Sequence, residues 1–151
     1  VKQMADDRGI EIETVIKEEG ASRSGEIAIH VEGGGKERYI VGHILQDQRP
    51  RIAEIDGYHM DMIPAGTMVI LRNEDRPGMV GLVGQEFGEA NVNIADMAIS
   101  RREDTALMVL KVDSDPPESL ISRMKARPGV LFVECVQLPP DHSDPNPEAE
   151  A

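Results

Sequence analysis

The stretch NEDRPGMVGLVGQEFGEANVNI, residues 73–94, decides the fold, because it places a polar loop, a helix and the entry to a strand in one unbroken run. Pro77 suits the first turn of a helix, where its fixed φ and its missing N–H cost nothing. Gly78 allows close approach to the backbone, and free N–H groups at a helix start attract a carboxylate or another anion. The run therefore predicts a pocket for a small ligand, although a proline and a glycine after a polar loop also begin ordinary helices.

Around this run the apolar periodicity predicts the order strand, helix, strand, strand, helix, strand. The expected strands are residues 67–71, 92–100, 105–112 and 130–138, and the expected helices begin at residues 77 and 116. The first helix should end before Asn91, with a core-facing stripe of Val80, Val83, Phe87 and Ala90. The order βαββαβ gives a ferredoxin-like, four-stranded antiparallel sheet with two helices on one face. Its other face or an edge is left available for pairing.

The chain ahead of this unit differs in character, which favours two domains within an α+β fold. Residues 1–64 form a small β-rich domain, and residues 66–138 form the βαββαβ domain. The strands expected in the first domain are residues 27–31, 39–45, 51–55 and 60–63, after a helix end at 1–9 and short apolar positions near 10–15. Residues 139–151 hold four prolines, four acidic residues and no large apolar residue, so they are expected to be a disordered tail.

The composition excludes several classes of partner. The chain has 28 acidic and 16 basic residues, which give a net charge of −12. Nucleic acids and anionic membranes bind clusters of Lys and Arg, so neither is an expected partner. The chain lacks an apolar run long enough to span a bilayer and a signal-peptide pattern, so a cytoplasmic location is expected. The single cysteine, Cys135, cannot form an internal disulfide, and its strand-like surroundings predict a buried structural thiol.

Signs of catalysis are weak throughout the sequence. It has no dinucleotide fingerprint and no local Ser, His and Asp signature, and its four histidines are scattered. The glycines at 33–35 lead into an expected strand rather than a helix, so a hairpin turn is favoured over a phosphate-binding loop. Abundant carboxylates make chance pairs common, and they predict no metal site. We therefore expect no catalytic residue, no metal and no cofactor in this chain.

The residues around the quoted run resemble a known family. The loop and the helix after it resemble the start of an ACT domain, an amino-acid-sensing module of biosynthetic enzymes. The resemblance extends over residues 1–138 to the C-terminal part of D-3-phosphoglycerate dehydrogenases, on RIAEIDGY (51–58), PAG (64–66), VNIADM (92–97) and ALMVL (106–110). It implies that residues 1–64 are part of an intervening, allosteric substrate-binding domain, and that the chain is a regulatory fragment of an NAD-dependent enzyme of serine biosynthesis whose catalytic part lies outside it.

The resemblance also implies a site and partners. In members inhibited by serine, the loop before Arg-Pro-Gly and an asparagine at the second strand hold the amino acid between two ACT domains of a homo-oligomer. The implied effector-binding residues are Asn73, Asp75, Gly78, Asn93 and Ile94, with L-serine as the effector. Asp75 would hold the ammonium group, and the helix start would hold the carboxylate. A basic residue at the position of Arg51 belongs to an anion site in some members, so Arg51 and His59 form a possible second site.

Two alternatives stay open at this point. The position of Asn73 is often His or Tyr in serine-binding members, and this departure favours an ACT module that only assembles the protein and binds no effector. The same pair of domains also resembles the β portion of an iron–sulfur L-serine dehydratase, although the DRPG loop and the IDGY turn fit the dehydrogenases better.

Overall fold

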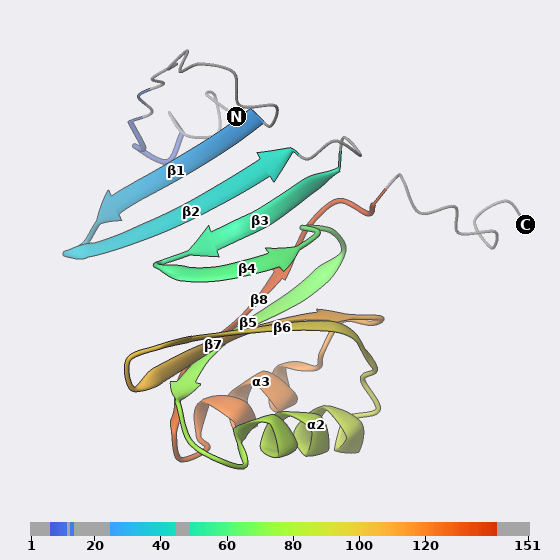
Figure 1. Cartoon of the computed structure of the whole chain (residues 1–151). Helices are drawn as coiled ribbons and strands as arrows, with labels where there is room; N and C mark the ends of the chain where they lie inside the picture. Colours follow the sequence, from blue (N-terminus) through green and yellow to red (C-terminus); the bar gives the residue numbers. More distant parts are fainter. Residues whose placement is uncertain (1–6, 12, 14–24, 45–48, 142–151) are drawn as a thin grey trace, which may run out of the picture.

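The computed structural model describes residues 7–11, 13, 25–44 and 49–141, which form two four-stranded sheets and two helices (Figure 1). The strands of the first sheet are β1 (Gly25–Gly33), β2 (Lys36–Ile44), β3 (Pro50–Ile55) and β4 (Tyr58–Met62). The strands of the second are β5 (Thr67–Glu74), β6 (Ile94–Arg102), β7 (Thr105–Val112) and β8 (Val130–Gln137). The helices are α2 (Met79–Glu89) and α3 (Glu118–Lys125).

The second sheet has the predicted ferredoxin-like topology. Its strand order is β6-β7-β5-β8, and every neighbouring pair is antiparallel. The two helices cover one face of this sheet (Figure 1). The α+β fold and the βαββαβ unit expected from the sequence are therefore confirmed, with β6 and β8 as the two edge strands.

The helices and the second sheet enclose one apolar core. Val83 and Phe87 of α2 are fully buried against Leu71 of β5 and Leu110 of β7, and Leu120 of α3 closes the same cluster. The expected stripe is wrong at Val80, whose side chain is 50% exposed, whereas Met79 is 4% exposed. The helix begins after Gly78, and at 100° per residue the buried face passes through positions 79, 83, 86 and 87 rather than 80.

The first sheet is a meander in the order β1-β2-β3-β4. Gly34 and Gly35 turn the chain between β1 and β2 with positive φ angles of 57° and 72°, so the glycine run forms a hairpin as expected. Asp56 and Gly57 turn the chain between β3 and β4, again with positive φ, 49° and 85°. Two consecutive residues with positive φ are typical of a type I′ turn, which suits the twist of a hairpin.

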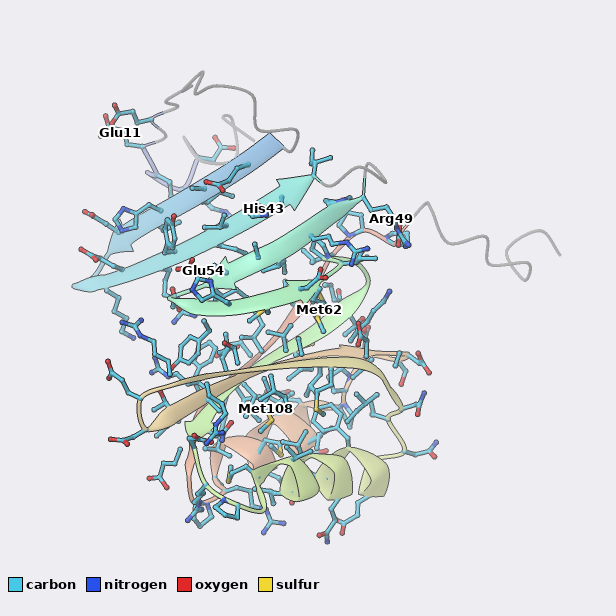
Figure 2. All side chains as sticks on the ribbon, in the orientation of Figure 1. Glu11, His43, Arg49, Glu54, Met62 and Met108 are labelled. Atoms are coloured by element: carbon cyan, nitrogen blue, oxygen red, sulfur yellow. The ribbon has the colours of Figure 1, made fainter. Side chains whose placement is uncertain are left out.

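The β3–β4 end of the first sheet packs on the face of the second sheet that lies opposite the helices, and β2 and β1 lie progressively farther from the second sheet (Figure 1). Ile52, Ile55 and Met62 of the first sheet contact Met68 and Val109 on the face of the second sheet that the helices leave free. Figure 2 shows Met62 between the sheets and Met108 on the helix side of β7. The free face of the βαββαβ sheet is thus covered within the chain, and its edges remain for pairing with other molecules. We call the apolar contact between the sheets the seam.

The outer part of the first sheet lies beyond the seam. Ile27, Ile29 and Val31 of β1 alternate as predicted, but their side chains are 59%, 52% and 52% exposed. The reason is the strand order: β3 and β4 lie over the second sheet, whereas β1 lies two strands further out. The seam therefore stabilises β3 and β4 directly and β1 only through its hydrogen bonds to β2.

Three further expectations concern the ends of the chain, helices that could span a membrane, and the single cysteine. Residues 7–9 form a turn, while Ile12, Val15, Leu45 and residues 142–151 lie outside the described residues. Within the part of the chain that the structure describes, no helix is long and apolar enough to cross a bilayer. The expectation of a buried thiol is wrong, because Cys135 lies on the edge strand β8 and is exposed.

Candidate functional site

The loop that joins β5 to α2 leaves the start of the helix open. Gly78 is the N-cap of α2, with a φ of +91° that favours glycine, and no side chain caps the first turn. A Cβ atom at Gly78 would meet nothing within 4 Å. The first backbone N–H groups of a helix have no partner inside it, so this open turn offers hydrogen-bond donors and the positive end of the helix dipole.

Asn73 lies beneath this loop and is 1% exposed. Its Nδ2 donates to the carbonyl oxygen of Glu74 at 2.6 Å, while its Oδ1 is buried and has no hydrogen-bond partner among the described residues. A buried acceptor without a donor is costly, so it is expected to receive a hydrogen bond from a group that reaches the loop. The described residues thus leave one acceptor of Asn73 without a donor, and the ligand-binding role of Asn73 stays a prediction.

Asp75 is the acidic group of the loop, and an arginine holds it in place. Its Oδ2 accepts from Nε and Nη2 of Arg101, both at 2.7 Å, and its backbone N–H donates to the carbonyl of Asp104 at 2.9 Å. Asp75 raises the pKa of Arg101 above its ordinary value. The sequence did not predict Arg101 as a partner of Asp75, because nothing in the spacing of two residues 26 positions apart marks them as partners.

Arg76 fixes the outer side of the loop. Its Nη2 donates to the carbonyl of Pro128 at 2.5 Å, and the amide of Glu74 donates to the carbonyl of Gly129 at 2.8 Å. A Cβ atom at Gly129 would lie 2.6 Å from the guanidinium of Arg76, so glycine leaves the space that Arg76 occupies. The two Arg-Pro-Gly tripeptides of the sequence thus pack against each other and anchor the loop.

Asn93 lies at the opposite end of the sheet. Its Nδ2 donates to Oδ2 of Asp113 at 2.6 Å, and Ile94, next in the chain, pairs with Val112 and packs against the helix core. Val112 also pairs with Thr67, the first residue of β5, whereas Asp75 follows the last. The eight residues of β5 span roughly 25 Å, so Asn93 and Asp75 of one chain do not reach one ligand.

Comparison with known proteins places this half of the chain in a family. Residues 67–131, which span β5 to the start of β8 and include the loop, match the ACT domain family. This part of the chain is an ACT domain.

Curated relatives extend the match beyond the ACT domain. D-3-phosphoglycerate dehydrogenase of Archaeoglobus fulgidus is 35% identical over 91% of this chain and 27% of its own length. The enzymes of Methanocaldococcus jannaschii and Bacillus subtilis are 36% and 27% identical over 74% and 90% of this chain, and over 22% and 26% of their own lengths. The chain thus spans about a quarter of the length of these relatives, and the resemblance noted in the sequence is confirmed.

The second predicted site lies on the first sheet, outside the ACT domain. Nη1 of Arg51 pairs with Oδ1 of Asp61 at 3.1 Å, and Nδ1 of His59 lies 3.5 Å from Oε2 of Glu54. The side chain of His59 is 83% exposed. Each predicted basic group therefore contacts a different carboxylate, and the anion site stays a prediction.

The most buried ionic group of the ACT domain is Glu86 of α2, a residue that no motif in the sequence singles out. Its side chain is 1% exposed and accepts from Nε of Arg123 at 3.0 Å and from Nε of Arg127 at 2.7 Å. These hydrogen bonds, that of Arg127 first, lower the pKa of Glu86 below its ordinary value of 4.5. Glu86 thus connects α2 to α3 and to the Arg-Pro-Gly turn at residues 127–129. These connections stabilise the elements that position the loop.

A group of three possible metal ligands and a run of glycines both lie at the β1–β2 hairpin. His30, Glu32 and Glu37 have ligand atoms within 4.8 Å of one another at the β1–β2 hairpin, but all three are exposed. The glycines of that hairpin join two strands, whereas a dinucleotide loop joins a strand to a helix. This glycine run is therefore a hairpin turn and not a dinucleotide loop, and the expectation that the chain holds no cofactor stays a prediction.

Proposed function

We propose that this chain is the regulatory part of a D-3-phosphoglycerate dehydrogenase and that its ACT domain binds an amino acid effector, L-serine, between two copies of the chain. The parent enzyme would be a cytoplasmic, NAD-dependent oxidoreductase whose catalytic residues lie elsewhere. Support for the parent activity comes from the names of the relatives. Support for the site comes from the geometry of the loop and of Asn93.

One observation carries the proposal: the residues implied in effector binding lie at opposite ends of a sheet whose edge strand is β6. Antiparallel pairing of β6 with β6 of a second copy, centred on Ala98, would place Ile94 opposite Arg102 of that copy. Asn93 would then lie beside the turn that holds Asp75 of the second copy. A twofold dimer therefore brings together, twice, the two half-sites that one chain keeps apart.

The assembled site has the donors and acceptors that an amino acid zwitterion needs. The carboxylate of Asp75 suits the ammonium group, while the open start of α2 and the guanidinium of Arg101 suit the carboxylate. The free Oδ1 of Asn73 and the amide of Asn93 suit a hydroxyl, which both donates and accepts. A small polar amino acid such as L-serine meets all these groups.

Calorimetric titration with L-serine, using Asp75→Ala and Asn93→Ala, tests both parts of the proposal. Each variant alone should bind no serine, because every site of its dimer lacks one half. After the two variants are unfolded and refolded together, random pairing should restore about a quarter of the sites, since half of the dimers are mixed and each has one intact site. Lys125→Ala, which removes an exposed ion pair on α3, is the matched control and should bind like the unaltered chain.

Two outcomes would contradict the proposal in different ways. Variants that lose binding without recovery on mixing would place the whole site within one chain. No heat from serine with the unaltered chain, in a dimer of normal stability, would favour an ACT domain that only assembles the protein. The existing pair between Asp75 and Arg101 is the observation that favours this second function, because it already satisfies the acidic group of the loop.

A further inference from the structure

The end of β6 and the turn that follows it, together residues 101–104 and called the turn below, contact both the effector loop and the first sheet. Side chains of consecutive strand residues point to opposite faces, so Arg101 and Arg102 leave the end of β6 in opposite directions. Arg101 reaches the loop, and Arg102 reaches the tip of the β3–β4 hairpin. The turn is thus a direct link between the candidate site and the seam.

On the loop side the link has two contacts. Oδ2 of Asp75 accepts both hydrogen bonds of Arg101 at 2.7 Å, and the amide of Asp75 donates to the carbonyl of Asp104 at 2.9 Å. Side chain and backbone of Asp75 are therefore both bound to residues 101–104. A displacement of the loop at Asp75 must break these contacts or move the turn.

On the side of the first sheet, Arg102 and Thr105 contact the tip of the β3–β4 hairpin. Nη1 of Arg102 donates to the carbonyl of Asp56 at 3.1 Å and occupies the space that a Cβ atom of Gly57 would take. The hydroxyl of Tyr58 meets Oγ1 of Thr105 at 2.6 Å. The tip is therefore held to the end of β6 and β7 by a charged group, a hydroxyl pair and close packing against a glycine.

The same tip also holds the first sheet together. The carboxylate of Asp56 pairs with Nε of Arg38 at 3.1 Å and accepts from the amide of Tyr39 at 2.8 Å, and its own amide donates to the carbonyl of Tyr39 at 2.8 Å. Arg38 in turn lies over the ring of Phe132, 5.1 Å from its centroid, on the second sheet. Asp56 is thus the point at which β2, the hairpin and the second sheet meet.

We propose that residues 101–104 couple the effector loop to the seam, with Arg101 responding to the group that binds Asp75 and Arg102 holding the hairpin tip. This inference rests on the proposed function in one respect, that the natural signal is an amino acid at Asp75. The ammonium group of such a ligand competes with Arg101 for one carboxylate, so the ligand favours an arrangement of the turn in which Arg101 has left Asp75. Arg101 and Arg102 are positioning residues. Coupling requires only that the hydrogen bond from Arg102 to Asp56 differs in strength between the two arrangements of the turn.

Hydrogen exchange of single amides in the full chain, followed by NMR, tests the coupling without any ligand. The amides of Tyr39 and Asp56 report on the hairpin tip that Arg102 holds at the edge of the seam, and the amide of Asp75 reports on the loop. Asp75→Asn should speed exchange at Tyr39 and Asp56 by about fivefold or more, the lower end of typical couplings between sites. Arg102→Ala should speed exchange at Asp75 by a similar factor, because coupling is reciprocal. The amides of Gly66 and Leu138, at the far end of the sheet, should not change.

The outcomes separate this inference from the proposed function. Faster exchange at Asp75 alone in Asp75→Asn, or a uniform increase that includes Gly66 and Leu138, would overturn the coupling. Lys125→Ala, which removes an exposed ion pair remote from the turn, should leave all five amides unchanged. With saturating L-serine, the amides of Tyr39 and Asp56 should respond in the unaltered chain and not in Arg102→Ala, although both bind serine by calorimetry. If serine gives no heat while the variants still couple, the ligand is wrong and the coupling stands.

Discussion

At the scale of single residues, Glu86 shows how a buried carboxylate is stabilised in its charged form. Two arginines donate to its carboxylate from α3 and the following turn, so the charged form is favoured despite its burial. Glu86→Gln should lower the free energy of unfolding by about 2 kcal/mol at pH 7, the scale of a hydrogen bond to a charged group. Chemical denaturation followed by circular dichroism measures this loss. Glu89→Gln on the exposed side of the same helix should change little.

The lowered pKa of Glu86 also fixes a pH dependence. A carboxyl group whose pKa is lower in the folded state stabilises the protein above its ordinary pKa of 4.5, and that stabilisation is lost as the pH falls through the folded value. The difference in unfolding free energy between Glu86→Gln and the unaltered chain should therefore be constant from pH 7 to about 5 and shrink below about 4. A difference that stays the same at pH 3 would contradict this account.

Cys135 is exposed, yet its surroundings disfavour the thiolate. Partial burial, followed by the carboxylates of Asp115 and Glu134, raises the pKa of the Cys135 thiol above 9.0. Alkylation by iodoacetamide should accordingly be slower at pH 7 than for an unhindered thiol and should accelerate as the pH rises past 9. Asp115→Asn should speed alkylation at pH 7 about twofold, since one screened negative charge is removed. Asp104→Asn, at the other end of the sheet, should have no such effect.

At the scale of elements, the hairpin tip of Asp56 and Gly57 combines a required conformation with a close contact. Gly57 has a φ of +85°, and a Cβ atom there would displace the guanidinium of Arg102. Gly57→Ala should lower the free energy of unfolding by about 1–2 kcal/mol, mainly through the left-handed backbone, since the arginine is long enough to move. Gly42→Ala in β2 is the control, because its φ is ordinary and its nearest contact would be 3.5 Å. Equal losses in both variants would mean that the backbone at the tip is not strained.

The sequence predicted elements better than it predicted partners. Alternating apolar residues, the Asp-Gly turn and the Arg-Pro-Gly loop each indicate local structure, so strands, hairpins and helices were found with errors of a few residues. Glu86 and Arg101 were missed because their partners lie 26–41 residues away and only the fold brings them together. The exposed face of β1 was missed for the same reason, because alternation shows which residues share a face and not whether another layer covers it.

At the scale of the whole molecule, the edge strand β6 is where a second copy would join. Ile99 on β6 is 43% exposed, and Leu131 on the opposite edge strand β8 is 49% exposed. Ile99→Glu should therefore convert the dimer to monomers, since two like charges would be buried near the twofold axis. Leu131→Glu should leave the dimer intact. Sedimentation equilibrium over a hundredfold range of concentration distinguishes the two variants. A dimer that persists in Ile99→Glu and dissociates in Leu131→Glu would place the interface on β8, where Asn93 of one copy would not meet the loop of the other, and the shared effector site would fall with it.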